Sequence, residues 1–371
     1  MLSRQRLLIT VLVGSMAMSC GPDEWPQLWN HYTASFMDGQ IRVIDRDSGD
    51  RTTSEGQAYA MFFTLVANDR TRFDKLLRWT ELNLAAGSLA ERLPAWLWGR
   101  SADGDWRVLD TNSASDADVW MAYLLFEAGA AWNEPRYTSI AEQLADRIAD
   151  EEVVDVPGIG RMLLPAPRGF HGNGKYRLNV SYLPLQLFIG LSERHRDGPW
   201  TSIAEQIPAL VRASSPHGFA TDWVDVSDAG EITPSSLGSY DAIRVYLWAG
   251  MLDPETPSRA EMLQAVPGMA RIVRTMHTPP AKITAAGVAV DHTSPVGFSA
   301  ALVPYLEALG ERQLAREQVS RMRSSTDGSS GLLGRPPKYY DQNLALFALG
   351  AREGLFWFDA RGRLRTKWMG Q

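Results

Sequence analysis

The sequence predicts an all-α protein built as a ring of helical hairpins, and three observations favour this fold class. Apolar residues recur at helical spacing in about twelve segments from one end of the chain to the other. Short links between these segments alternate with long ones, which cover residues 85–115, 151–179, 214–238 and 277–296. No repeat of fixed length is present, which argues against a helical solenoid. In a ring of hairpins, we expect the long links to gather at one end and to wall a cleft.

The expected helices cover residues 24–38, 54–68, 71–85, 115–131, 136–151, 179–193, 199–214, 238–249, 257–277, 296–310, 311–324 and 340–351. Helix-start signals support three of them. Thr53-Ser54-Glu55 opens the second, Ser113 or Ser115 opens the fourth, and Pro135 stands at the start of the fifth.

Strand signals are few. The clearest is a C-terminal hairpin formed by Leu355–Phe358 and Leu364–Trp368, with a turn that contains Gly362. The length of 371 residues would allow two or three domains. Because no Pro/Ser/Gly-rich linker and no run of like charge divides the chain, we expect residues 21–371 to form a single domain.

The first twenty residues resemble a secretory signal. Arg4 and Arg6 form a basic start, Leu7–Met18 is almost entirely apolar, and small residues precede Cys20. An apolar run of this length is too short to span a bilayer as a helix. We therefore expect residues 1–20 to be a signal peptide and the mature chain to be periplasmic or secreted, with an N-terminal core helix as the alternative.

Cys20 is the only cysteine, so no intramolecular disulfide can form. Two interpretations of Cys20 remain open: it is the lipid-modified first residue of a lipoprotein, or it only neighbours the cleavage site. The usual lipoprotein signal has Leu three residues before the cysteine, where this chain has Ala17. Contact with a membrane is expected only through such a lipid.

The charge and the aromatic content limit the partners. Loss of residues 1–20 would remove two arginines and move the net charge from −6 to −8, which argues against nucleic acids and anionic polysaccharides as partners. The chain also has 13 Trp, 11 Tyr and 12 Phe. Most of these rings must belong to the core, but exposed ones could stack on sugar rings.

Three short stretches place a carboxylate at the start of a helix. In the first, Glu55 is followed by Gly56, where a ligand could approach closely. In the second, Asp116 and Asp118 are two residues apart and cannot face the same way. In the third, Asp241 lies three residues before Arg244, which could pair with it and keep it ionised.

Each stretch has a plain structural explanation. Glu55 could simply complement the helix dipole, and Asp241 could belong to a structural ion pair. The spacing of Asp116 and Asp118 could serve calcium, but no further oxygen ligands follow at EF-hand spacing. We therefore expect no calcium site in this stretch.

Five motifs resemble glycoside hydrolase family 8, and most of all the periplasmic endoglucanases of bacterial cellulose-synthesis operons. They are TTSEGQAYAMFFTLVANDR, ERLPAWLWG, NSASDADVWMAYLLFEAG, SYDAIRVYLWAGM and PVGFSAALVPYL. They occur in the family's order, and the resemblance runs from about Trp25 to the end. It implies an (α/α)6 barrel and inverting hydrolysis of β-1,4-glucans without a metal or an organic cofactor.

The resemblance also implies residue roles. Glu55 takes the place of the general acid, Asp241 that of the general base, and Asp116 that of the residue that holds the distorted sugar. The residues expected to line the glucan cleft are Trp96, Tyr182, Tyr240 and Arg244. Two positions depart from close relatives: Val180 stands in place of Pro, and Gly238 in place of Ser.

An inverting glycosidase needs its two carboxyl groups about 6.5–9.5 Å apart, with a water molecule between the base and the sugar. We expect burial and the charge of Asp116 to raise the pKa of Glu55 against the effect of the helix dipole. A role beside the cellulose synthase complex, as an accessory to cellulose synthesis, follows from the resemblance alone.

Three alternatives remain. A chitosanase or xylanase of the same fold would differ mainly in its cleft residues. A polysaccharide lyase needs a basic cleft, which disagrees with the acidic chain and with six scattered histidines. A non-catalytic glucan-binding protein would not need all three carboxylates.

Overall fold

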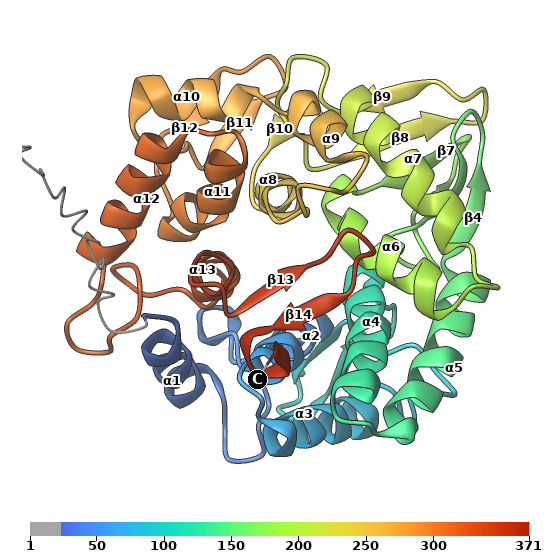
Figure 1. Cartoon of the computed structure of the whole chain (residues 1–371). Coiled ribbons are helices and arrows are strands. Elements are labelled where there is room, and N and C mark those ends of the chain that lie inside the picture. The colour runs from blue at the N-terminus through green and yellow to red at the C-terminus, as the bar shows by residue number, and fades with distance from the viewer. Residues whose placement is uncertain (1–23, 371) are drawn as a thin grey trace, which may run out of the picture.

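The computed structural model describes residues 24–370, and its helices form a ring (Figure 1). The expected signal peptide and Cys20 lie outside the described residues. The thirteen α-helices within residues 24–370 are α1 (Glu24–Phe36), α2 (Ser54–Val66), α3 (Arg70–Asn83), α4 (Ser115–Ala131), α5 (Pro135–Glu151), α6 (Leu185–Arg194), α7 (Trp200–Ala213), α8 (Ile243–Gly250), α9 (Arg259–Ala265), α10 (Gly268–Met276), α11 (Val296–Ala308), α12 (Arg312–Ser324) and α13 (Tyr339–Arg352). Three 3-10 helices are η1 (Arg46–Ser48), η2 (Val180–Tyr182) and η3 (Lys367–Gly370).

Helices alternate between an inner and an outer layer. The inner layer is made of α2, α4, α6, α8, α11 and α13, each in contact with the next, and Phe62 of α2 stacks on Phe347 of α13 to close the ring. Inner helices such as α4 and α11 are buried almost throughout, whereas the outer helix α5 buries one face. The predicted ring of helical hairpins, an (α/α)6 barrel, is confirmed.

The expected helix over 257–277 is two helices, because Pro267 separates α9 from α10. Proline disfavours helical geometry in the residue before it and is well suited to the start of a helix. Two further helices begin later than expected. Residues 179–184 form η2 and a turn before α6, and the expected helix at 238 begins at Ile243.

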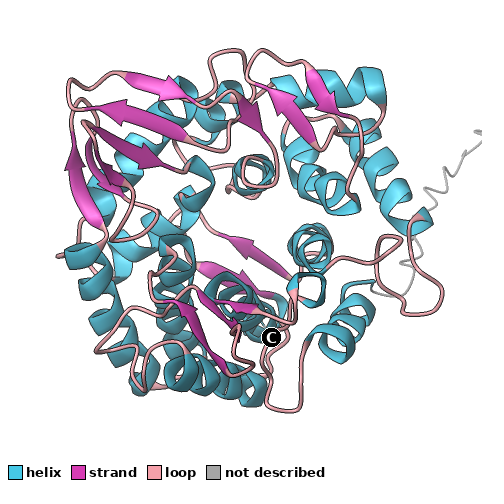
Figure 2. Ribbon diagram, turned by 180° about the vertical axis from the view of Figure 1, so that it is seen from behind, coloured by secondary structure: helices cyan, strands magenta, loops and turns pink. Residues whose placement is uncertain are grey.

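The strands are short, and most of them lie in the long links, where the sequence has no clear strand signal (Figure 2). The fourteen strands within residues 24–370 are β1 (Thr52–Thr53), β2 (Leu97–Arg100), β3 (Trp106–Asp110), β4 (Val153–Val156), β5 (Gly160–Leu163), β6 (His171–Gly172), β7 (Lys175–Leu178), β8 (Val224–Ser227), β9 (Ile232–Pro234), β10 (Leu237–Gly238), β11 (Lys282–Thr284), β12 (Ala289–Asp291), β13 (Phe356–Phe358) and β14 (Leu364–Thr366). They form small antiparallel sheets in the orders β1-β2-β3, β6-β7-β8-β9 and β10-β11-β12, with the hairpins β4-β5 and β13-β14.

The C-terminal hairpin β13-β14 lies across the end of the barrel where the inner helices α2 and α4 finish (Figure 1). Phe356 and Phe358 pack on Phe62 of α2, with ring centroids 4.7 and 6.3 Å apart. The Tyr123 hydroxyl of α4 donates to the Gly362 carbonyl at 2.7 Å. The predicted hairpin is therefore present, and it covers this end of the ring.

The opposite end of the barrel is where the inner helices begin. Each long link leads directly into the start of an inner helix: α4, α6, α8 or α11. The links therefore gather at this end, as expected, and so do the helix starts that carry the candidate carboxylates.

Candidate active site

Glu55 lies in the first turn of α2, at the end of the barrel where the inner helices begin. Thr53 caps this helix, because its hydroxyl accepts a hydrogen bond from the Gly56 amide at 3.2 Å. The Glu55 side chain is half-buried. Burial first, and the negative charge of Asp116 second, raise its pKa to about 7, although a backbone hydrogen bond and Arg244 act in the opposite direction. Glu55 can therefore hold a proton close to neutral pH.

Arg244 joins the two other carboxylates. Its guanidinium is buried, and Nη1 donates to Asp116 Oδ2 at 2.9 Å and to the Tyr59 hydroxyl at 3.1 Å. Nη2 donates to Asp241 Oδ1 at 2.9 Å and to the Ser181 hydroxyl at 3.0 Å. The pairing of Asp241 with Arg244 expected from their spacing is present, and the same arginine also binds Asp116.

Burial and the arginine act in opposite directions on these two carboxyl groups. The pKa of Asp241 and that of Asp116 are both raised, mainly by burial, while Arg244 lowers them. The ion pair thus limits the rise in the pKa of Asp241 without cancelling it. Asp116 also accepts a hydrogen bond from the Ala117 amide at 2.9 Å, which fixes its orientation.

Asp222, in the link before α8, holds the turn that presents Asp241. Its Oδ1 accepts hydrogen bonds from the amides of Ser239 (2.7 Å) and Ala242 (2.9 Å), and its Oδ2 accepts one from the Ser239 hydroxyl (2.6 Å). Asp241 therefore projects from a turn that is fixed on both sides.

Packing leaves no room for a side chain at Gly238, one of the two positions expected to depart from close relatives. A Cβ atom there would lie 2.2 Å from the carbonyl oxygen of Ala220. A larger residue would displace the strand that leads to Asp241. Val180, the other position expected to depart, is buried in η2, next to Ser181.

Aromatic side chains extend from the carboxylates on one side. The guanidinium carbon of Arg244 lies 5.4 Å from the ring centroid of Tyr182. The Tyr182 ring lies 6.5 Å from Trp223, which stacks on Phe170 at 5.8 Å. These rings form a continuous series from the buried arginine to the loop around Phe170.

Tyr240 and Trp96 lie beside the same helix starts. Tyr240 is 39% exposed, and its carbonyl accepts a hydrogen bond from the Tyr340 hydroxyl at 2.7 Å. Trp96 is half-buried, and its carbonyl accepts a hydrogen bond from the Ser54 amide at 3.0 Å, next to Glu55. Tyr240 therefore directly precedes Asp241 in the sequence, and Trp96 is hydrogen-bonded to the residue that precedes Glu55.

The fold thus brings Asp116, Asp241, Arg244 and Tyr182 into one cluster. Glu55 is linked to this cluster because, besides burial, the negative charge of Asp116 raises its pKa. Sequence reasoning missed several side chains that complete the cluster. Tyr59 and Ser181 lie inside or beside the quoted motifs, so proximity to them could have suggested both. For Asp222 and Trp223 we see no comparable signal. The missed residues are Tyr59, Asn179, Ser181, Asp222, Trp223 and Tyr340.

The two aspartates of the Asp-x-Asp stretch face different partners. Asp116 binds Arg244, whereas Asp118 is fully buried and interacts with Glu152. Within residues 24–370, no group of three or more His, Cys, Asp and Glu side chains is arranged to hold a metal ion. None of the helices in the same range combines the length and the apolarity needed to cross a bilayer.

A helical barrel with a cluster of carboxylates and aromatic rings at one end is the arrangement expected of a glycoside hydrolase. The chain belongs to the family described as glycosyl hydrolases family 8, which matches residues 4–354. The predicted resemblance to this family is therefore confirmed, and the protein is a glycoside hydrolase.

The relatives agree in sequence and in structure. An endoglucanase from Xanthomonas axonopodis pv. citri is 44% identical, over 99% of this chain and 98% of its own length. The crystal structure of an endo-1,4-D-glucanase from Vibrio fischeri matches with a TM-score of 0.84 and 36% identity, covering 92% of this chain and 99% of that one. A cold-adapted family 8 xylanase has a TM-score of 0.67 at 16% identity, covering 89% and 91%, and shares the fold.

Proposed function

We propose that this protein is an endo-β-1,4-glucanase that cleaves cellulose-type chains with inversion of configuration. Glu55 is the general acid, Asp241 the general base, and Asp116 holds the sugar at the cleavage subsite. The observation that carries the proposal is the contrast between the carboxyl groups. The pKa of Glu55 is raised to about 7, whereas Asp241 and Asp116 are both paired with the buried cation of Arg244. The endoglucanase names of the relatives support the glucan substrate.

In this mechanism, protonated Glu55 gives its proton to the leaving glycosidic oxygen, so that the departing sugar leaves as a neutral alcohol. Ionised Asp241 takes a proton from a water molecule, which attacks the anomeric carbon from the opposite face. Asp116 stays ionised against Arg244 and bonds the sugar hydroxyls as positive charge develops on the ring. The carboxyl separation expected of an inverting enzyme stays a prediction.

The test of this function measures both activity and stereochemistry. We expect the mature protein to release reducing ends from soluble carboxymethylcellulose. We also expect proton NMR of cello-oligosaccharide hydrolysis to show the α-anomer first. Initial release of the β-anomer would contradict inversion. Activity on xylan or chitosan, with none on the cellulose derivative, would show that the substrate is xylan or chitosan and not a β-1,4-glucan. Binding without turnover would favour a non-catalytic glucan-binding protein.

The pH dependence of kcat/KM is expected to be bell-shaped. Glu55 must be protonated, so activity holds below its pKa of about 7 and falls about tenfold per pH unit above it. Asp241 must be ionised, so activity falls when the pH drops below the pKa of Asp241. Because this pKa is raised, activity is lost at a higher pH than the ordinary pKa of Asp would give. Rates measured from pH 4 to pH 9 in constant ionic strength check both limbs.

The contribution of Asp116 to the alkaline limb can be separated by NMR titration of the Glu55 carboxyl in Asp116→Asn. Removal of the like charge is expected to lower the pKa of Glu55. A pKa of Glu55 that is unchanged in Asp116→Asn would leave burial as the sole cause.

We also propose that the enzyme works in the periplasm or outside the cell, beside a cellulose synthase complex. The pattern of Arg4, Arg6 and the apolar run before Cys20 supports export. The likeness to the endoglucanases of cellulose-synthesis operons supports the partner. Mass spectrometry of the mature N-terminus from cells decides whether Cys20 is the first residue and carries lipid, and an intact residue 1 would contradict export by cleavage.

A further inference from the structure

Two buried carboxyl groups that the proposed reaction does not use lie behind Asp116. Asp118 is in the first turn of α4, and Glu152 follows directly after the end of α5. Neither residue has any exposed surface. The two side chains interact with each other, and two carboxyl groups can share a hydrogen bond only if one of them carries a proton.

Very few hydrogen-bond donors reach this pair. The hydroxyl of Ser113 lies near both groups and donates its single hydrogen to Glu152 Oε1 at 2.5 Å. Among residues 24–370, no other side chain or amide donates to either oxygen of Asp118 or to Oε2 of Glu152. Buried carboxylate oxygens without donors are strongly unfavourable, so a retained proton is the remaining way to satisfy them.

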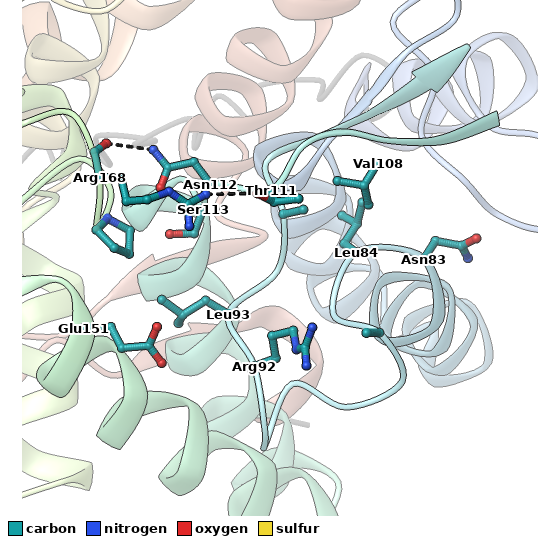
Figure 3. A pocket seen from close by; sticks show the side chains of 13 residues that line it. Asn83, Leu84, Arg92, Leu93, Val108, Thr111, Asn112, Ser113, Glu151 and Arg168 are labelled. Carbon is teal, nitrogen blue, oxygen red and sulfur yellow. Dashed lines mark hydrogen bonds between the residues drawn. The ribbon is translucent and has the colours of Figure 1, made fainter. Parts of the chain in front are cut away.

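The charged neighbours also favour the retained proton. Asp116 from α4 and Glu151 from α5 both add negative charge near the pair. Ser113 also lines a cavity of about 440 Å³, whose lining includes Glu151 and two arginines, Arg92 and Arg168 (Figure 3). These arginines line the cavity, whereas the pair itself is enclosed.

Burial is the main cause of the altered acidity. It raises the pKa of Asp118 well above the usual range for Asp and that of Glu152 to about 8. At neutral pH the pair therefore keeps its proton in the folded protein, while both carboxyl groups would be ionised in the unfolded chain.

The pair fixes the start of α4 on both sides of Asp116. Ser113 precedes Asp116 by three residues and Asp118 follows it by two, and both bind Glu152. The backbone adds a second tie, because the Ser115 amide donates to the carbonyl of Pro165 at 3.0 Å. Any movement of Glu152 would therefore be transmitted to the turn that carries Asp116.

We propose that Asp118 and Glu152 share a proton and act as a positioning pair that holds Asp116 against Arg244 and the bound sugar. This inference rests on the proposed role of Asp116 in the active site. In this proposal Asp118, the second aspartate of the Asp-x-Asp stretch, does not contact the substrate. It acts by keeping Asp116 in position.

The proton makes stability depend on pH in a defined direction. A carboxyl group whose pKa is higher in the folded state is neutral there while it ionises in the unfolded chain. The contribution of this pair to folding is therefore most favourable below about pH 4, where unfolded carboxyls are still protonated. It becomes less favourable as the pH rises through about 8, the pKa of Glu152, and levels off only once Asp118, whose pKa is also raised, has ionised too.

The test uses Asp118→Asn, whose amide can donate to an ionised Glu152 and replaces the shared proton. We expect the melting temperature of this variant to rise relative to wild type between pH 5 and pH 8, with a difference of several degrees at pH 8. At pH 6 its kcat is expected to stay within about threefold of wild type. Glu152→Gln, with the amide on the other partner, is expected to behave in the same way.

Asp118→Leu is the matched variant of similar size that cannot hydrogen-bond. Its kcat is expected to fall at least about tenfold with little change in KM, because Asp116 loses its fixed position. Equal kcat values in the Asn and Leu variants would overturn the positioning role. A melting-temperature difference between Asp118→Asn and wild type that is the same at pH 5 and pH 8 would overturn the shared proton. The melting experiment needs no substrate, so an inactive wild type would count against the proposed function alone.

Discussion

Glu55→Gln is expected to reduce the hydrolysis of carboxymethylcellulose by about 10²–10⁴-fold, the usual contribution of a positioned general acid. Glutamine has the shape of a protonated glutamate and keeps its hydrogen bonds, but it has no proton to give. The first turn of α2, capped by Thr53, should be undisturbed. Initial rates of reducing-end release at pH 6, compared with wild type, measure the effect.

Substrates with different leaving groups can distinguish the loss of proton donation by Glu55 from general damage to the active site. With an aryl cellobioside whose phenol is strongly acidic, departure needs little protonation, so Glu55→Gln should lose less than about tenfold. Glu91→Gln, at an exposed glutamate in the link before α4, is the matched control and should be fully active. Equal losses on both substrates would show that the defect of Glu55→Gln is not in proton donation.

Arg244→Leu is expected to lower both stability and activity, because it leaves the buried Asp116 and the half-buried Asp241 without their shared cation. Removal of one partner of a buried ion pair destabilises a protein by about 3–5 kcal/mol. Arg244 binds Asp116 and Asp241 at 2.9 Å each, so we expect an effect in this range. The loss of kcat is expected to reach about 10²–10³-fold, since a preorganised donor at the site is removed. Urea unfolding and steady-state rates measure the two effects.

The acid limb of the pH profile should move as well. Without Arg244 the pKa of Asp241 rises further, so activity would be lost at a higher pH than in wild type. Arg244→Lys keeps the charge but cannot bridge two carboxylates with a planar fork, and is expected to fall between wild type and Arg244→Leu. The control is Arg136→Leu, from a surface pair with Asp74, which should change stability by about 0–1 kcal/mol. Wild-type stability in Arg244→Leu would contradict this account.

The helices could be predicted from sequence because their buried faces follow a regular spacing. The segments expected at 115–131 and 136–151 correspond closely to α4 and α5. The strands in the long links could not, because each has only two to five residues and its partner lies in a different part of the link or beyond it. Strand β7, for example, pairs with β8, which follows two helices later. Pro267 itself was a signal for the break between α9 and α10. The helical spacing of apolar residues on both sides nevertheless favoured one continuous helix.

Contacts in the site could be predicted where both residues belong to the same sequence motif. Asp241 and Arg244 are three residues apart, and their ion pair follows from helix geometry. Partners from distant segments were not predictable in this way. Asp222 lies 17 residues before Ser239, and Glu152 lies 34 residues after Asp118. Neither has a neighbouring pattern that distinguishes it from an ordinary surface acid.

The C-terminal hairpin has a consequence for how a polymer can be held. Because β13-β14 packs on Phe62 where α2 finishes, and Trp120, Trp248 and Phe347 of three inner helices pack against one another, side chains fill the interior of the ring. A long chain cannot be threaded through a filled ring, so under the proposed function an internal segment lies across the end where the inner helices begin. We therefore expect the segment to enter and leave sideways, so that the position of a cut does not depend on finding either end of the polymer.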